Sequence, residues 1–270
     1  MQRARLDVRD RFSDDFDPLL PPRRYGLPSQ IRAVGERIVD KALIEIGGLE
    51  PDERVLDIGC GPGRVAAPLT RYLTDGSYEG FDVMPRSIRW AQRKITTRHP
   101  NFRFQVADID NLMYNPGGSQ TAATFRFPYP DASFDVSLAT SVYTHLRPYE
   151  TANYLSETGR VMRSGGRVLN TFFLLNEEAE RLVAAGPRRP LLAGGGILKL
   201  NYATVDPQGY RFRAANAEVP ENLLALYEDD VRAMYEEAGL EITDILYGHW
   251  CGRPSNSEEF GQDLVVARKR

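Results

Sequence analysis

Three closely spaced glycines are the clearest chemical signal in the sequence. Gly59, Gly61 and Gly63 end the apolar stretch that begins at Val55, and a helix-like run starts directly afterwards at Arg64. Glycine is needed where the backbone takes a positive φ, or where a Cβ would collide with whatever lies across the turn. A strand, a glycine turn and a helix N-terminus together predict a nucleotide-binding corner.

The spacing of these glycines separates two classes of ligand. The dinucleotide pattern G-x-G-x-x-G requires its third glycine where this chain has Arg64. Asp57 lies just before the turn, where it can accept hydrogen bonds from backbone or from a cationic ligand but would repel a pyrophosphate. The spacing therefore disfavours a dinucleotide, and an NAD-dependent oxidoreductase is kept as an alternative.

The stretch from Val55 to Gly63 resembles the first motif of the class I S-adenosylmethionine-dependent methyltransferases. That motif reads hydrophobic, hydrophobic, Asp or Glu, hydrophobic, Gly-x-Gly-x-Gly. The resemblance extends over about residues 51–269, and it implies S-adenosylmethionine as cofactor and S-adenosylhomocysteine as product. The first-motif residues that it assigns to cofactor binding are Asp57, Gly59, Cys60, Gly61 and Gly63.

Acidic residues end the second and third predicted strands, 77–84 and 102–107. Asp82, followed by Val83, lies where a carboxylate accepts hydrogen bonds from two ribose hydroxyls, although it is also placed to cap the helix predicted near Pro85. The resemblance implies that the Asp108 carboxylate accepts a bond from the adenine amino group. It also implies that the Ile109 N–H contacts the adenine ring.

The fourth predicted strand, 134–140, leads into the candidate acceptor residues. The resemblance implies that Ala139 and Thr140 lie under the sulfonium. His145 follows, and its reference pKa of about 6.5 suits a general base, although packing on the next helix is an equal alternative. Tyr143 is predicted to shape the acceptor pocket or to fill core, and His249 is the second candidate base.

Strands and helices alternate along the chain, which predicts an α/β fold, and the resemblance makes it a Rossmann-like, doubly wound sheet. It implies seven strands in the order 3-2-1-4-5-7-6, with the last strand antiparallel. We expect one domain over residues 1–270. Two segments are additional to it: an N-terminal helical cap, 1–49, and an insertion after the fifth strand, 176–222.

The insertion is interpreted as a lid, because ligands bind outside the carboxyl ends of parallel strands. Its aromatic residues Tyr202, Tyr210 and Phe212 would be costly to leave in water, which argues against a merely decorative loop.

Composition excludes several other functions. The formal net charge of −3 offers no polyphosphate-binding face, so a nucleic-acid substrate is not expected. The chain has only two cysteines and no apolar run of about eighteen residues, which predicts a cytoplasmic protein without a membrane span. Residues 140–146 contain no carboxylate, so no metal is predicted.

Together these features predict methyl transfer from S-adenosylmethionine to a small molecule, most simply to a hydroxyl oxygen of a metabolite or sugar. Nitrogen and carbon acceptors remain alternatives, as does a cofactor-binding partner subunit that has lost catalysis. Neither the acceptor nor the oligomeric state follows from the sequence.

Overall fold

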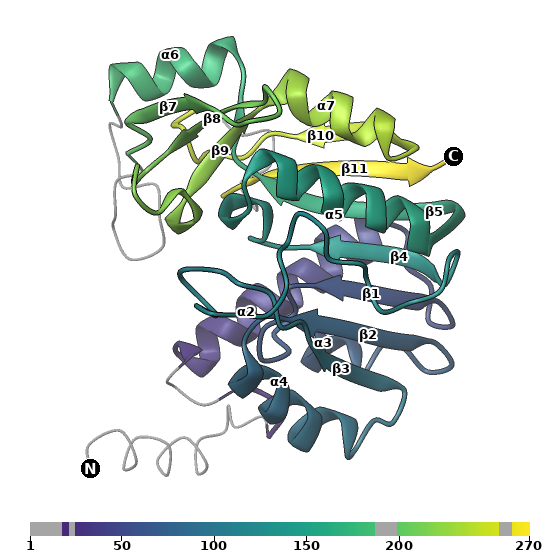
Figure 1. Ribbon diagram of the computed structural model, residues 1–270. Coiled ribbons are helices and arrows are strands. Elements are labelled where there is room, and N and C mark those ends of the chain that lie inside the picture. The colour runs from purple at the N-terminus through teal and green to yellow at the C-terminus, as the bar shows by residue number, and fades with distance from the viewer. Residues whose placement is uncertain (1–17, 22–24, 187–198, 254–260) are drawn as a thin grey trace, which may run out of the picture. The chain divides into compact units, whose positions relative to one another are not determined.

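The computed structural model describes residues 18–21, 25–186, 199–253 and 261–270 (Figure 1). The chain forms two compact units, Met1–Ala107 and Asp108–Arg270. Its seven-stranded sheet has the order β10-β11-β5-β4-β1-β2-β3. With β10 and β11 counted as the sixth and seventh strands of this sheet, the order is the predicted 3-2-1-4-5-7-6. The Rossmann-like α/β prediction is confirmed.

The first unit contains three parallel strands, β1 to β3, with β2 between the other two. Helix α4 and the π-helical turn η3 pack on β2 and β3. The N-terminal helix α2 continues into the π-helical η2 and packs on the short helix α3. The bounds are β1 Arg54–Ile58, β2 Ser77–Asp82, β3 Phe102–Val106, α2 Pro28–Arg37, η2 Ile38–Ile46, α3 Ala66–Leu69, α4 Pro85–Ala91 and η3 Gln92–Thr96.

Helix α3 is much shorter than the helix predicted from Arg64 to Leu73. Pro68 has no N–H, so it cannot donate to the carbonyl four residues earlier, which is that of Arg64. This carbonyl instead lies against Gly35 of α2, so closely that a Cβ at Gly35 would collide with it. The proline therefore interrupts the helical pattern just where the N-terminal helix packs onto the glycine turn.

The second unit contains the other four strands of the sheet. Strands β4 and β5 are parallel, and β11 is antiparallel to both β5 and β10, as predicted for the last strand. Helices α5 and α7 pack against each other beside these strands (Figure 1). The bounds are β4 Phe134–Ala139, η4 Tyr143–His145, α5 Pro148–Val161, β5 Met162–Phe172, α7 Glu228–Glu237, β10 Leu240–Leu246 and β11 Asp263–Lys269.

The insertion after β5 forms a second sheet with the order β6-β9-β8-β7. Phe212 is buried in it as expected, whereas Tyr202 is 48% exposed, so the expected burial of the aromatic residues holds only in part. Whether this segment acts as a lid stays a prediction, as do the N-terminal cap and the single domain. The bounds are β6 Leu174–Leu175, α6 Glu177–Ala185, β7 Tyr202–Val205, β8 Arg211–Ala214, η5 Pro220–Asn222 and β9 Leu224–Tyr227.

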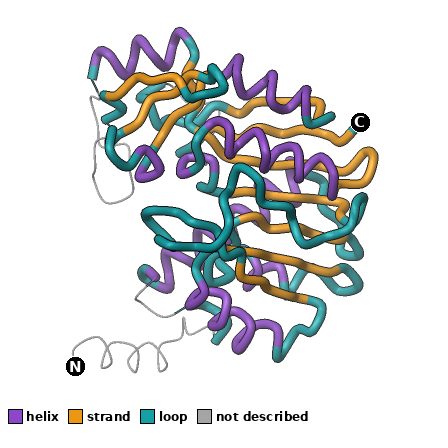
Figure 2. The backbone as a smooth tube through the Cα atoms, viewed as in Figure 1, coloured by secondary structure: helices purple, strands orange, loops and turns teal. Residues whose placement is uncertain are grey.

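A long connection, residues 107–133, joins β3 to β4 without forming a helix or a strand (Figure 2). Loops of this length in compact proteins are commonly functional. The loop is described throughout and belongs, except for Ala107, to the second unit. It brings side chains to the candidate acceptor residues, as shown below.

The close approach of α5 to the end of α7 gives a test of the packing. A Cβ at Gly159 of α5 would collide with the carbonyl oxygen of Ala238. We expect Gly159→Ala to lower the free energy of unfolding by about 1–3 kcal/mol through overpacking. Ser156→Ala is the control, because it places the same side chain at an exposed position of the same helix. Urea unfolding measures both, and equal stability of the two variants would contradict the packing described here.

Candidate cofactor and acceptor site

The glycine turn after β1 has the backbone geometry that its sequence predicts. Gly59, Gly61 and Gly63 have φ values of 72°, 55° and 89°. A Cβ at Gly63 would lie 2.6 Å from Cδ1 of Ile95, so this glycine is required for packing. A Cβ at Gly61 would meet nothing within 4 Å. The turn is therefore packed on one side and open at Gly61.

Asp82, at the end of β2, holds this turn. Its Oδ2 accepts a hydrogen bond from the Gly61 N–H and its Oδ1 accepts one from the Met84 N–H, both at 2.8 Å. Burial raises the pKa of Asp82, and the two hydrogen bonds oppose that rise. Met84 is the N-cap residue of α4, and no side-chain cap hydrogen bond is formed there, so Asp82 holds the residue before the helix and the capping alternative stays a prediction. Each oxygen keeps a second lone pair, so the ribose role stays a prediction.

Asp57 is a buried acid with an unused oxygen. Its Oδ2 accepts a 2.6 Å hydrogen bond from the Tyr78 hydroxyl, whereas its Oδ1 accepts none from any residue in the described part of the chain. Burial raises the pKa of Asp57 to about 7, and the Arg64 charge partly opposes this rise. A buried carboxylate oxygen without a donor, next to the glycine turn, fits a ligand that brings its own cationic donor.

Two further residues near the turn have defined roles. The Cys60 side chain packs over Gly80, where a Cβ would lie 2.9 Å from its Sγ, and burial raises the pKa of this thiol. Arg64 is half-buried and interacts electrostatically with Asp57, a role that sequence reasoning missed. The only sequence signal was its position after the third glycine. Val83 is half-buried after Asp82.

Asp108 and Ile109 open the second unit. The Asp108 carboxylate accepts hydrogen bonds from the Ser119 hydroxyl at 2.7 Å and from the Asn115 amide at 3.2 Å, and these bonds lower its pKa. The bridge between Ile109 and Gln120 uses the Asp108 carbonyl and the Asp110 N–H, and leaves the Ile109 N–H outside it. The predicted adenine contacts therefore remain compatible with the local hydrogen bonding.

Beyond β4, the chain turns sharply at Ser141, which has a φ of 59°. Its N–H donates to the Thr171 hydroxyl at 2.8 Å, and its own hydroxyl donates to Gln262 at 3.3 Å. A non-glycine residue in this region is strained and is held by such contacts. Ala139 and Thr140, the predicted cofactor contacts, directly precede this turn. Ala139 is buried and Thr140 is half-buried.

His145 is oriented by two hydrogen bonds. Its Nδ1 lies 2.9 Å from the Glu221 carbonyl oxygen, and its Nε2 lies 3.3 Å from the Tyr114 hydroxyl. Because a carbonyl only accepts, Nδ1 carries the hydrogen and the neutral ring has its lone pair on Nε2. Burial lowers the pKa of His145. The ring is therefore neutral near pH 7, with a basic nitrogen facing Tyr114.

The remaining candidates lie elsewhere. Tyr143 is buried and stacks on Phe172 with ring centroids 4.6 Å apart, which is the alternative core position; a role in the acceptor pocket stays a prediction. His249, the second candidate base, is exposed. The structure thus brings Asp57 and Asp82 to one turn, and His145 to the loop that carries Asp108. Among the described residues, His249 makes no side-chain hydrogen bond to either group.

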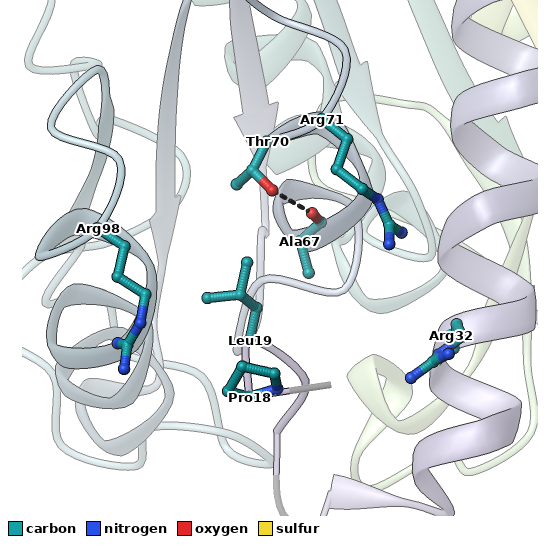
Figure 3. Close-up of a pocket in the computed structure, with 7 residues that line it drawn as sticks. All are labelled: Pro18, Leu19, Arg32, Ala67, Thr70, Arg71 and Arg98. Carbon is teal, nitrogen blue, oxygen red and sulfur yellow. Dashed lines mark hydrogen bonds between the residues drawn. The ribbon is translucent and has the colours of Figure 1, made fainter. Parts of the chain in front are cut away.

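A cavity of about 370 Å³ lies elsewhere in the first unit and contains none of the predicted site residues (Figure 3). Arg71 lines it and pairs with Glu36 at 3.3 Å. Figure 3 shows the arginines entering it from three separate elements. The cavity is lined by Pro18, Leu19, Arg32, Ala67, Thr70, Arg71 and Arg98.

The described residues contain neither a cluster of metal ligands nor a membrane-spanning helix. In those ranges, no three His, Cys, Asp or Glu side chains gather as a metal site would require. The expectation that no metal is used stays a prediction. Likewise, no helix within the described part of the chain has both the length and the apolarity needed to cross a bilayer.

Comparison with known proteins agrees with this arrangement. Residues 55–166 match a family model described as a methyltransferase domain. The chain is 32% identical over 232 residues to phthiotriol/phenolphthiotriol dimycocerosates methyltransferase 1 of Mycobacterium ulcerans, covering 83% of this chain and 72% of that protein. It is 30% identical over 188 residues to 27-O-demethylrifamycin SV methyltransferase of Amycolatopsis mediterranei, covering 66% and 63%.

Among solved structures, a SAM-dependent methyltransferase from Methanosarcina mazei has a TM-score of 0.51 and 18% identity, over 84% of this chain and 96% of that one. The chain belongs to the class I S-adenosylmethionine-dependent methyltransferases. S-adenosylmethionine is its methyl donor, which excludes the alternative of a nicotinamide oxidoreductase.

The raised pKa of Asp57 predicts a pH dependence of stability. Between about pH 4 and 7 the folded state keeps a proton on Asp57 that the unfolded state loses, so the free energy of unfolding falls as pH rises. The fall is at most about 4 kcal/mol. We expect Asp57→Asn to flatten this slope in urea unfolding. The exposed Asp52→Asn is the control, and an unchanged slope in Asp57→Asn would refute the assignment.

Proposed function

We propose that this enzyme methylates a hydroxyl oxygen of its small-molecule acceptor, with His145 as general base. The observation that carries the proposal is the orientation of His145, whose Nδ1–H donates to the Glu221 carbonyl and leaves Nε2 basic. The name of the Amycolatopsis relative, a 27-O-demethylrifamycin methyltransferase, also supports an oxygen acceptor.

The predicted cofactor-binding residues would each contact a different part of S-adenosylmethionine. When bound, S-adenosylmethionine supplies a methyl carbon made electrophilic by the sulfonium. Asp57 would accept a hydrogen bond from the α-ammonium group through its free Oδ1, and Asp82 would accept bonds from the ribose hydroxyls. Asp108 and Ile109 would hold the adenine. The open face of the turn at Gly61 allows the ligand to approach bare backbone.

On the acceptor side, His145 has a defined proton to take. As the bond between the acceptor oxygen and the methyl carbon forms, the carbon–sulfur bond would break and leave S-adenosylhomocysteine. The acceptor proton would pass to Nε2 of His145, and the resulting imidazolium would keep its Nδ1–H on the Glu221 carbonyl. That bond is stronger to the charged ring and so stabilises the product of proton transfer. General-base catalysis of this kind contributes about 10²–10⁴ in rate. Positioning of the acceptor provides much of the remainder.

The cofactor cradle is tested at Gly61. Gly61→Ala places a methyl group into open space, so the ligand and not the protein is obstructed. We expect the affinity for S-adenosylhomocysteine to fall at least about tenfold by calorimetry, equivalent to about 1.4 kcal/mol.

Gly165→Ala is the matched control for that experiment. Gly165 also has a positive φ, 77°, and open space at its Cβ, but it lies at the start of β5, away from every predicted contact. The backbone strain is therefore shared by the two variants. Equal affinities in both would mean that the turn does not face the cofactor.

The base is tested by release of S-adenosylhomocysteine with a panel of alcohols, phenols, amines and carbon acids. With a hydroxyl acceptor we expect His145→Ala to lower kcat by about 10²–10⁴, with His249→Ala unchanged. In the wild type, kcat/KM should fall only below pH 6.5, because burial lowers the pKa of His145.

Two results would contradict this proposal. The first is an unchanged kcat in His145→Ala with S-adenosylhomocysteine affinity intact, which would remove His145 from the mechanism. The second is turnover with amines or carbon acids alone, which would replace oxygen as the acceptor atom. Binding of S-adenosylhomocysteine without turnover of any acceptor would indicate the partner-subunit alternative.

A further inference from the structure

Three consecutive apolar side chains on the loop after Ile109 are exposed to solvent. Leu112, Met113 and Tyr114, here called the apolar tip, are 54%, 47% and 37% exposed. Elsewhere in the described ranges, large exposed apolar side chains are never adjacent in sequence; they are Leu27, Val106, Tyr202 and Val205. Burying such side chains is favourable, so a cluster left exposed marks a surface with a binding partner.

The tip is built as a short, hydrogen-bonded turn. Asn111 Oδ1 accepts the N–H groups of Met113 and Tyr114 at 3.1 and 3.0 Å. The backbones of Asn111 and Asn115 exchange two hydrogen bonds, and the Asn115 side chain donates to the Ile109 carbonyl at 3.0 Å. Moving the apolar side chains inward would break these bonds. The turn therefore presents them outward in a fixed arrangement.

The tip adjoins the candidate base. The Tyr114 hydroxyl lies 3.3 Å from Nε2 of His145, and the two rings meet edge to face with centroids 5.3 Å apart. A hydroxyl group therefore already occupies the place where an acceptor hydroxyl must donate. The exposed apolar side chains of Leu112 and Met113 directly precede Tyr114 in the chain.

The charges around the tip argue for a free molecule as its ligand. Asp108 and Asp110 are exposed beside it. These acids would be repelled by an anionic membrane surface, and a symmetric contact between two copies would bring like charges together. A neutral lipophilic molecule meets neither penalty.

We propose that the methyl acceptor is a lipophilic alcohol or phenol, whose hydrocarbon part binds the apolar tip. Its hydroxyl displaces the Tyr114 phenol from His145 Nε2. The proposal rests on the proposed function for the role of Nε2, and it adds the substrate class. Tyr114 is in this view a positioning residue that holds the ring of His145 until the acceptor arrives.

Calorimetric titration of the full chain with primary alkanols from butanol to decanol, in the presence of S-adenosylhomocysteine, tests the proposal without turnover. We expect the wild-type affinity to rise with chain length, by up to about fourfold per methylene. Leu112→Ser and Met113→Ser should reduce that increment. Ile245→Ser, which removes a half-buried apolar side chain from the edge strand β10, should keep it.

Tyr114→Phe separates the two parts of the proposal. This variant keeps the aromatic ring at position 114 but lacks the hydroxyl that competes for His145 Nε2. We therefore expect alkanols to bind more tightly to the variant than to the wild type. Weaker binding in this variant would overturn the displacement. A chain-length increment that Leu112→Ser and Met113→Ser leave unchanged would overturn the role of the tip.

Other occupants of the tip would also be detected. A change of oligomeric state in Leu112→Ser by sedimentation velocity, or binding of the wild type to phosphatidylserine vesicles that this variant loses, would overturn the proposal. Tip-dependent alkanol binding without methyl transfer to any alkanol would support the lipophilic ligand and count against the proposed hydroxyl transfer. The two proposals therefore fail in distinguishable ways.

Discussion

The cofactor side of the molecule depends on one buried carboxylate. Asp82 accepts one N–H from the glycine turn after β1 and one from the residue before α4, so a single side chain at the end of β2 connects the turn to the start of α4. The turn has no Cβ at Gly61 to reinforce it by packing, and its conformation rests on hydrogen bonds. Because Asp82 is buried, losing either partner would leave a polar group without compensation.

A comparable constraint operates in the second unit through Glu221. Its carbonyl oxygen holds Nδ1 of His145, while its carboxylate binds Nε of Arg147 at 2.7 Å. Asp206 of the same insertion accepts the N–H of Tyr149 at 3.1 Å, in the first turn of α5. The insertion therefore caps α5 and orients the candidate base that precedes it. This explains why a segment outside the common fold is needed for the proposed chemistry.

Asp108 connects the two ligands of the proposed reaction. Its carboxylate anchors Asn115 and Ser119, which both follow Tyr114, the residue that contacts His145. The same residue is predicted to hold the adenine. In the proposed function, the carboxylate that holds the adenine therefore also anchors the loop that carries the acceptor surface.

The sequence by itself determined the positions of the strands, the glycine turn and the places of Asp57 and Asp82, because apolar periodicity and positive-φ glycines are local properties. The strand order followed from the resemblance to the methyltransferase family. The sequence predicted a longer helix α3 than the structure has. Pro68 leaves the Arg64 carbonyl without its helical donor, and the packing of Gly35 against that carbonyl could not be read from the sequence. Only the tertiary structure decided that Arg64 faces Asp57, that Tyr143 stacks in the core, and that Glu221 sets the tautomer of His145. The last two contacts join residues far apart in the chain, and for all three the spacing carries no information about which atoms meet.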